Sequence, residues 1–313
     1  MEANNTQKSP NLPPEIISLI VHEIASQNSA LEALKACSLV SKSFCFSCRR
    51  HLFSDIELLS DSWQSQAARL VKILQNPDNV GLAACVRSLT LIFDVQSNRT
   101  YSFLGSRTLG YRLNKSKMTA LTLAARLRLY EDNLIKVLNL LMQAHLESFT
   151  LHARRGVSDW ETEAGAARSM KKAVFMACTA PLTTLRLSNL VNIDEYLIAR
   201  VIHSSTLKEL VLTNVTLKVY DEDANFDPQP MTSQIERLDL RRVSYMQVFR
   251  VMGHPTLAAL PMPYPFISLS RLRNLVISSP WTDLEADPLR EFMLGVAKTL
   301  ETLEIEEINW RGT

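Results

Sequence analysis

Three cysteines and one histidine lie close together in the N-terminal part of the sequence, and both residue types bind zinc in proteins. Cys45, Cys48 and His51 are spaced by three residues, and Cys37 precedes them. On a helix each residue is turned by about 100° from the one before, so side chains with this spacing do not converge on one metal ion. The other two cysteines stand alone and offer no second pair of ligands. We therefore interpret these cysteines as small buried side chains and predict no bound metal.

Other catalytic patterns are incomplete. His22 and Glu23 begin a zinc-protease pattern, but Ser26 stands where the second histidine is required. The acidic residues within 221–227 lack the spacing and the central glycine of a calcium-binding loop, and a solvated loop explains them better. The sequence contains neither a nucleophile elbow nor a phosphate-binding or dinucleotide-binding glycine pattern. We predict no catalytic residues and no cofactor.

Composition indicates an intracellular globular protein. Hydrophobic residues make up 46% and charged residues 21% of the 313 residues, and the formal net charge is +2. An odd number of cysteines in a long chain argues against a secreted disulfide framework. The sequence has neither a signal-peptide pattern nor an apolar run long enough to span a bilayer. These features predict a cytoplasmic or nuclear protein that does not bind membranes.

One stretch has an unbalanced charge. Residues 95–130 contain several lysines and arginines and no acidic residue, so they could contact the phosphates of a nucleic acid. The stretch has few aromatic residues and no base-reading motif, which makes nucleic acid an unlikely partner. A solvated face, or attraction of an acidic or phosphorylated protein, explains the charge better.

The first elements expected along the chain are three short amphipathic helices within residues 12–53. Pro13 and Pro14 suit the first turn of a helix. Ser29 and Glu32 have the spacing of a capping box, in which each side chain accepts a backbone amide at the start of the second helix. Three helices of this size cannot bury all their apolar faces against one another. The apolar residues at helical spacing are Ile16, Ile17, Ile20, Val21, Ile24, Leu31, Leu34, Leu39, Val40, Phe44, Cys48 and Leu52.

A short apolar pattern recurs through the rest of the chain. It consists of an apolar residue, two variable residues, a second apolar residue, one variable residue and a third apolar residue. The last two apolar positions alternate with polar ones, as a strand buried on one face requires. Helical patterns lie between the matches. The matches begin at Val86, Leu146, Leu182, Leu207, Ile235, Leu272 and Leu300.

This repeat resembles the leucine-rich repeat, although the intervals between matches are irregular. Strand–helix alternation predicts an α/β fold, and we expect an irregular leucine-rich-repeat-like solenoid of parallel strands with outer helices. An α/β sheet with right-handed crossovers is the alternative. The asparagine ladder of that family is expected to be missing. Its position holds Leu190, Val215, Val243 and Ile308, whereas Asn189 and Asn214 lie one residue earlier.

In such a solenoid the side chains between the core leucines point to the concave face, where repeat proteins commonly bind partners. They are mixed in charge and size. The alternative is that they are only solvated sheet residues. The candidate substrate-binding residues are Thr150, Arg186, Val211, Asp239, Arg241, Val276 and Glu304.

The N-terminal helices resemble an F-box, in the variant common in mushroom-type fungi. The motif begins with Leu12, Pro13, Glu15 and Ile16, and continues with Ile20, Leu34, Val40, Ser41 and Phe44. The sequence CSLVSKSF, followed by CRRHLFSDIEL, also resembles this F-box variant, although most relatives have Trp in place of Phe44. The resemblance implies docking to the Skp-type adaptor of a Skp–cullin–F-box ubiquitin ligase. The residues expected to form the adaptor-binding surface are Leu12, Pro13, Ile16, Ile20, Leu34, Val40 and Phe44.

The sequence and this resemblance together predict a non-catalytic substrate-recognition subunit, with an adaptor, a cullin bound through it, and an unknown protein substrate as partners. We expect a disordered arm at 1–11, an F-box at 12–60, a helical linker at 61–85 and a repeat domain at 86–313. One alternative is a protein-interaction scaffold unrelated to ubiquitin. The other is an enzyme or nucleic-acid binder whose site is built from insertions such as 95–130.

Overall fold

The computed structural model describes the chain from residue 12 to residue 306 with several internal gaps. The described residues are 12–27, 29–59, 63–94, 133–154, 158–159, 175–177, 180–218, 231–252, 267–278 and 283–306. The expected disordered arm, the basic stretch at 95–130 and the acidic segment at 221–227 lie outside these residues.

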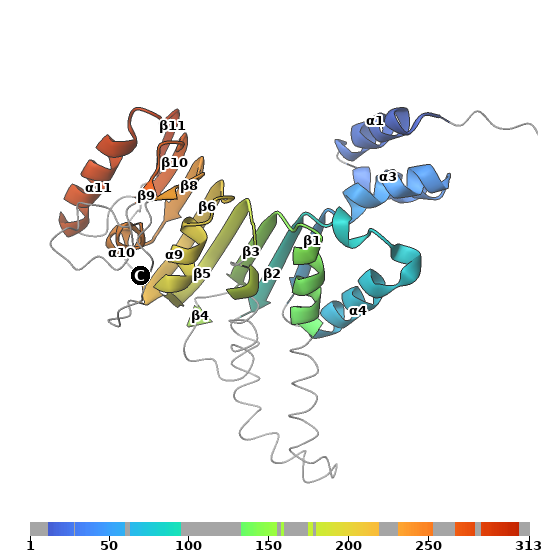
Figure 1. Ribbon diagram of the computed structural model, residues 1–313, viewed down its shortest axis with the longest axis horizontal. Coiled ribbons are helices and arrows are strands. Elements are labelled where there is room, and N and C mark those ends of the chain that lie inside the picture. Colours follow the sequence, from blue (N-terminus) through green and yellow to red (C-terminus); the bar gives the residue numbers. More distant parts are fainter. Residues whose placement is uncertain are drawn as a thin grey trace, which may run out of the picture.

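Three helices at the N-terminal end pack together around a small core of their own. They are α1 (Pro14–Ala25), α2 (Ala30–Ser38) and α3 (Lys42–Leu52). Their shared core consists of Ile17, Val21, Leu34 and Cys48, all buried. The α1 helix begins at a proline, as predicted. Proline is tolerated there because a backbone N–H in the first turn would have no partner within the helix. These helices lie at one end of the molecule, beside β1 (Figure 1).

The capping box predicted for α2 is wrong. Ser29 is the N-cap, but its side chain makes no capping hydrogen bond. Glu32 instead pairs with Lys35 one turn later, with 2.7 Å between Nζ and Oε1. A side-chain cap occurs at the next helix, where the Ser41 hydroxyl accepts the backbone N–H of Phe44 at 3.3 Å. The serine of the Val-Ser pair therefore has a structural role, because it satisfies an amide at the start of α3.

The strands of the rest of the described chain form a sheet in which every strand pair is parallel. Its eight main strands are adjacent in the order in which they follow along the chain, and β4 (Ser158–Asp159) joins the far end of β5. A separate short pair joins β7 (Met231–Thr232) to β9 (Ile267–Ser268). The eight strands are β1 (Asp55–Leu59), β2 (Ser88–Asp94), β3 (Ser148–Arg154), β5 (Thr184–Asp194), β6 (Glu209–Lys218), β8 (Arg237–Arg241), β10 (Asn274–Ser278) and β11 (Thr302–Glu306).

All seven strands predicted from the repeat are confirmed, and equivalent residues of the repeat lie side by side. Leu89 of β2 is aligned with Phe149 of β3, and Leu210 of β6 with Leu238 of β8. The strand β1 was not predicted from the sequence, and it pairs in the same register through Ile56 and Leu89. Its residues follow the same apolar template, but they belong to the stretch of sequence that resembles the F-box.

A repeated hydrogen-bond arrangement fixes this register. The carbonyl oxygen of the residue before each strand accepts two backbone amides from the start of the next strand. Thr183 O, for example, accepts from Lys208 N at 2.8 Å and from Glu209 N at 3.0 Å. The residue before each strand acts in this way from Ser54 to Arg273. The contact is made by the backbone, so it holds whatever side chain occupies the position.

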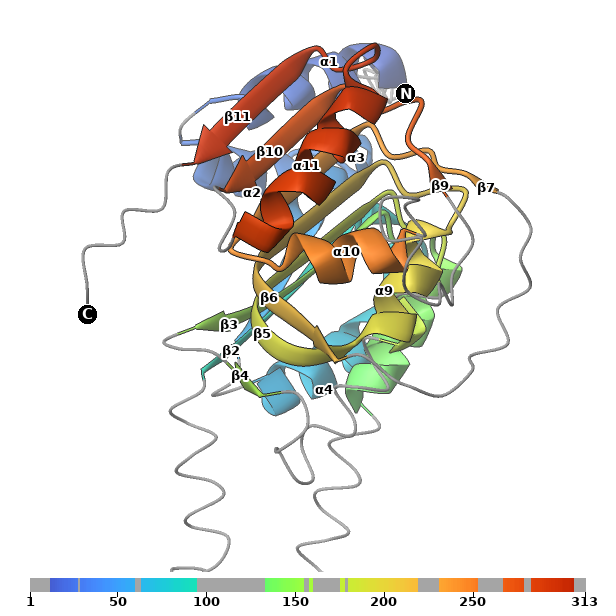
Figure 2. The same ribbon diagram turned by 90° about the vertical axis from the view of Figure 1, so that its left-hand side faces the viewer.

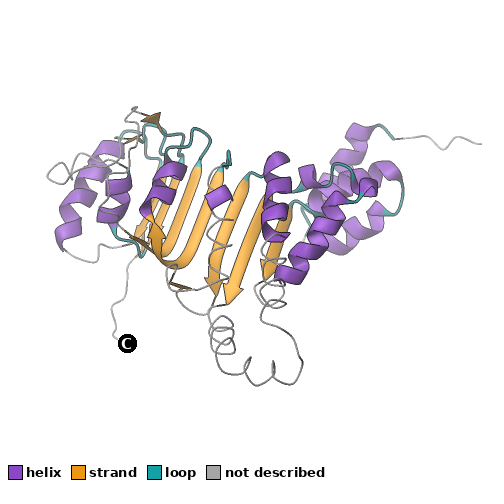
Figure 3. Cartoon of the chain, turned by 60° about the horizontal axis from the view of Figure 1, so that its bottom comes forward, coloured by secondary structure: helices purple, strands orange, loops and turns teal. Residues whose placement is uncertain are grey.

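Helices cover one face of the sheet. They are α4 (Trp63–Gln75), a helix at 133–143, α9 (Glu195–Ile202), α10 (Tyr245–Val251) and α11 (Asp283–Val296). Figure 2 shows α9, α10 and α11 against the same side of the sheet, and Figure 3 shows the helices along one side of the row of strands. The main core lies between them and the leucine rows. Among the described helices, none has both the length and the apolar character that crossing a lipid bilayer requires.

The expectation that an asparagine ladder is missing is wrong for the middle of the sheet. Asn214 donates through Nδ2 to Asn189 Oδ1 at 3.0 Å, and Asn189 donates to the carbonyl oxygen of Ala153 at 2.9 Å. Both asparagines have φ near +59° and +54°, a left-handed conformation that asparagine tolerates better than most residues. They connect β3, β5 and β6 just beyond the aligned rows. The ladder lies one residue earlier than the leucine-rich-repeat pattern places it.

Candidate binding surfaces

The candidate adaptor-binding residues divide into an exposed group and a core group. Leu12, Pro13, Ile16 and Ile20 are exposed along α1, and Val40 is exposed in the turn between α2 and α3. Leu34, by contrast, is only 4% exposed, and Phe44 packs partly buried against the same core. The exposed group is available to a partner, whereas Leu34 and Phe44 hold the three helices together.

Four large apolar residues that are exposed on the same helices were not among the candidates. Leu19 on α1, Leu31 on α2, Leu39 at the end of α2 and Phe46 on α3 are 65%, 56%, 87% and 53% exposed. Leu39 directly precedes Val40, so two apolar side chains stand in solvent at the same turn. Helical periodicity does not show which apolar residues are buried in so small a bundle. Ile16 and Ile17, for example, are neighbours in the apolar stripe, yet only Ile17 is buried.

The candidate substrate-binding residues lie on the sheet face opposite the helices. Register aligns Thr150, Arg186, Val211, Asp239, Val276 and Glu304 in one row across six strands, and Arg241 lies in the next row. We name this surface the open face. Its residues are not equally accessible, because Asp239 and Val276 are buried within the row, whereas Arg186 and Glu304 are exposed.

An ion-pair network connects the charged residues of the open face. Arg186 Nη2 lies 3.2 Å from Glu209 Oε1, and Arg237 Nε lies 3.5 Å from the same oxygen. Arg237 Nη2 then lies 3.9 Å from Asp239 Oδ2. The side chain of Glu209 is 19% exposed and that of Asp239 is 6% exposed, so both carboxylates are well shielded from water.

Arg241 extends the network over a strand. Its Nε lies 2.9 Å from Asp239 Oδ1 on its own strand, β8. Its guanidinium also reaches past β10 to β11, where Nη2 lies 3.5 Å from Glu304 Oε1. Val276 is the β10 residue aligned with both Asp239 and Glu304, and its side chain is short enough for the guanidinium to reach past it. Isolated surface ion pairs contribute little to stability, but here one arginine holds a buried carboxylate and joins non-adjacent strands.

The protonation of Asp239 reflects two opposing effects. Burial raises the pKa of Asp239 above its ordinary value, and the hydrogen bond from Arg241, together with the charges of Arg241 and Arg237, opposes that rise. The same hydrogen bond, which Arg241 donates to Asp239, raises the pKa of Arg241. The burial effect is the largest for Asp239, so its carboxyl accepts a proton at a higher pH in the folded protein than in the unfolded chain.

This difference predicts a pH-dependent loss of stability. Between the unfolded pKa near 3.8 and the raised folded pKa, the folded state binds more protons at Asp239 than the unfolded state does. The free energy of unfolding therefore falls as pH rises through that window. We expect wild type to lose stability relative to Asp239→Asn as pH rises from about 4. Urea unfolding of both proteins at several pH values measures this, and a difference that stays constant or changes in the opposite direction would contradict it.

The cysteines that suggested a metal site lie around the core of the N-terminal helices. Cys48 is fully buried in it, and burial raises the pKa of the Cys48 thiol. Burial likewise lowers the pKa of His51, whose ring lies 5.8 Å from that of His22. Within the described part of the chain, no three metal-binding side chains come together in a group that could hold an ion.

Comparison of the sequence with models of known protein families finds no match, and comparison with curated proteins finds none either.

Proposed function

We propose that this chain is the substrate-recognition subunit of a Skp–cullin–F-box ubiquitin ligase. In this proposal α1, α2 and α3 form the F-box and bind a Skp-type adaptor, and a cullin binds through that adaptor. The sheet domain binds a protein substrate in the cytoplasm or the nucleus, and other subunits transfer ubiquitin to it. The chain itself supplies no catalytic residue in this role.

The observation that carries the proposal is the apolar surface of the N-terminal helices. The three helices share a core of four buried residues, while Ile16, Leu19, Leu39 and Val40 remain exposed beside it. Covering such side chains contributes about 25 cal/mol for each Å² of apolar surface removed from water. Helices that present an apolar face commonly dock into a hydrophobic groove on a partner. The resemblance of the sequence to an F-box supports a Skp-type adaptor as that partner.

We further propose that the sheet domain is an irregular leucine-rich-repeat-like solenoid. The order of its strands supports this, because it runs without reversal from β1 to β11. Doubly wound α/β sheets reverse their strand order at a switch point and carry helices on both faces. Here the helices cover one face, and the Asn189–Asn214 ladder repeats a feature of the proposed family.

The open face is the proposed substrate surface. Its side chains are the ones that vary from strand to strand, whereas the rows facing the helices are uniformly apolar. Specificity for a substrate would therefore depend on residues such as Arg186 and Glu304, which are exposed and charged. Charged groups of this kind steer a partner into register and exclude partners of the wrong charge.

Co-purification with a fungal Skp-type adaptor tests the proposal. We expect the full-length chain to capture the adaptor in a stoichiometric complex that persists in high salt, because the contact is apolar. Ile16→Asp and Val40→Asp should each weaken binding by about 2 kcal/mol, or roughly 30-fold, if these residues are anchors of the interface. Titration calorimetry with the purified adaptor measures both effects.

Two further variants provide matched controls. Ile73 on α4 is 41% exposed, close to the 42% of Ile16, and Leu294 on α11 is 67% exposed, close to the 68% of Val40. Ile73→Asp and Leu294→Asp should leave adaptor binding unchanged. Failure of a well-folded wild-type chain to capture any adaptor would overturn the proposal, and so would equal weakening by the control variants.

A further inference from the structure

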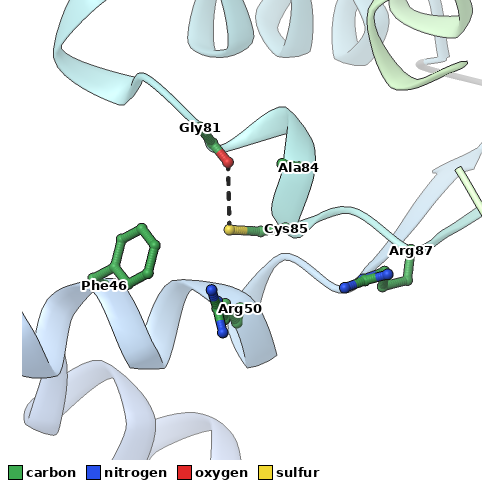
Figure 4. Close-up of a pocket in the computed structure, with 6 residues that line it drawn as sticks. All are labelled: Phe46, Arg50, Gly81, Ala84, Cys85 and Arg87. Carbon is green, nitrogen blue, oxygen red and sulfur yellow. Dashed lines mark hydrogen bonds between the residues drawn. The ribbon is translucent and has the colours of Figure 1, made fainter. Parts of the chain in front are cut away.

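A small cavity lies where the N-terminal helices meet the start of the sheet. Its volume is about 170 Å³. Figure 4 shows Arg50 and Arg87 along one side and the thiol of Cys85 facing them from the other. Cys85 Sγ donates to the carbonyl oxygen of Gly81 at 3.6 Å, which holds the far wall in place. The lining residues are Phe46 and Arg50 of α3, Gly81, Ala84 and Cys85 around the 3-10 helix η2 (Ala83–Cys85), and Arg87 just before β2.

Positive charge at this cavity exceeds negative charge. Within the described residues, neither Arg49 nor Arg50 forms an ion pair with a carboxylate. Arg87 pairs with Glu147, but its side chain remains 58% exposed and its guanidinium has further N–H groups to donate. The Arg50 guanidinium lies 5.0 Å from the centre of the Phe46 ring, a cation–π contact that positions it at the mouth of the cavity.

The pKa of the Cys85 thiol is affected by the same positive charges. Burial raises the pKa of Cys85, and the positive charges of Arg50, Arg49 and Arg87 oppose that rise. Three arginines from two separate segments thus act on one buried atom. Bringing like charges together costs free energy unless an anion lies between them. Among the described residues, the only carboxylate paired with these arginines is that of Glu147, which does not line the cavity.

We propose that this cavity binds the phosphate group of a small molecule, with Arg50 and Arg87 donating hydrogen bonds to its oxygens. Guanidinium groups bind phosphate through paired N–H donors, and such charge-assisted bonds are stronger than neutral ones. The cavity is large enough for a group bigger than one water molecule, which needs only about 10–15 Å³ of such space.

Binding at this place would join two parts of the fold. Arg50 belongs to α3, whereas Arg87 immediately precedes β2, so one phosphate held by both would connect the N-terminal helices to the sheet. A ligand bound only by the folded state raises the free energy of unfolding by RT ln(1 + L/Kd), where L is the concentration of free ligand. The inference does not rest on the proposed ligase role, because none of the adaptor-binding candidates lines the cavity.

Thermal unfolding of the full-length chain in inorganic phosphate or pyrophosphate tests the proposal, with sodium chloride added to keep the ionic strength constant. We expect millimolar pyrophosphate to raise the Tm of wild type by a few degrees. Arg50→Gln/Arg87→Gln should lose this shift. Arg50→Lys keeps the charge without the planar pair of donors, so it should bind pyrophosphate about ten-fold more weakly by calorimetry.

The matched control is Arg200→Gln/Arg273→Gln. Arg200 makes a cation–π contact like that of Arg50, with 5.3 Å between its guanidinium and the centre of the Phe175 ring. Arg273 pairs with Glu301 and occupies the position before its strand that Arg87 occupies before β2. This variant should keep the full shift. An unchanged Tm of wild type in both anions would overturn the proposal, as would a shift that survives in the cavity variant or disappears in the control.

Discussion

Replacing Arg250 with alanine is expected to lower the free energy of unfolding by about 3–5 kcal/mol. Arg250 of α10 lies against Glu195, the first residue of α9, with 3.6 Å between Nε and Oε2. The side chain of Glu195 is 2% exposed and that of Arg250 is 19% exposed. The distance is beyond normal hydrogen-bond length, so the attraction between the two is mainly Coulombic. Removing the guanidinium takes a nearby positive charge away from a buried carboxylate.

The reason for the large effect is the cost of burying a charge. A carboxylate taken out of water loses several kcal/mol of hydration, which the adjacent guanidinium recovers in part. Glu195 also gains from its position in the first turn of α9, where the helix dipole favours negative charge. Urea unfolding measures the loss directly, provided that the transition of the variant remains cooperative.

Two controls separate this buried pair from ordinary surface ion pairs. Arg186→Ala removes an exposed partner of Glu209 and should cost less than about 1 kcal/mol. Replacing both members of the buried pair, as in Glu195→Leu/Arg250→Met, should recover most of the stability lost by Arg250→Ala, since apolar residues of similar volume carry no hydration cost. A loss below about 1 kcal/mol for Arg250→Ala would show that the carboxylate is not dependent on this partner.

The second large effect concerns two leucines at equivalent positions of the repeat. Leu210 of β6 and Leu303 of β11 occupy the same row of the sheet, but Leu210 is fully buried and Leu303 is 44% exposed. Leu210→Ala should lower the free energy of unfolding by about 2–5 kcal/mol, because it leaves a cavity between strand and helices. Leu303→Ala should cost less than about 1 kcal/mol, because water already contacts that side chain.

Chemical denaturation of the two variants measures this contrast. The substitution is the same in both, so the difference between them isolates burial from the change of residue type. Equal losses would contradict the proposal that each strand is stabilised by the neighbours that cover it. A large loss for Leu303→Ala alone would show that β11 is buried in solution.

The strands could be predicted from the sequence because one-sided burial leaves a simple pattern. An apolar residue at alternate positions is required wherever a strand lies on a core, and the same spacing in seven places also predicted the register. β1 satisfies the pattern through Phe53, Ile56 and Leu58, but a pattern cannot assign a residue to a sheet when the surrounding sequence already matches a helical motif.

The surfaces could be predicted only in part, since exposure depends on what packs nearby. The F-box resemblance placed Ile16 and Leu34 together as binding candidates, yet one faces solvent and the other completes a core. The position of Arg241 in the open-face network could not be foreseen, because its reach to Glu304 depends on short side chains on the intervening strand. The left-handed conformation of Asn189 and Asn214 could not be read from spacing, because both residues lie within strands, β5 and β6.

The carbonyl oxygen that accepts two amides at the start of the next main strand also makes strand alignment independent of the length of the connections. The equivalent positions Ser88 and Ser148 are sixty residue numbers apart, and Thr184 and Glu209 are only twenty-five apart, yet both pairs are aligned without offset. A connection can therefore lengthen or shorten without moving the residues beside it. Length then changes in the connections, and under the proposed function recognition changes through single substitutions on the open face. Each can change independently of the other.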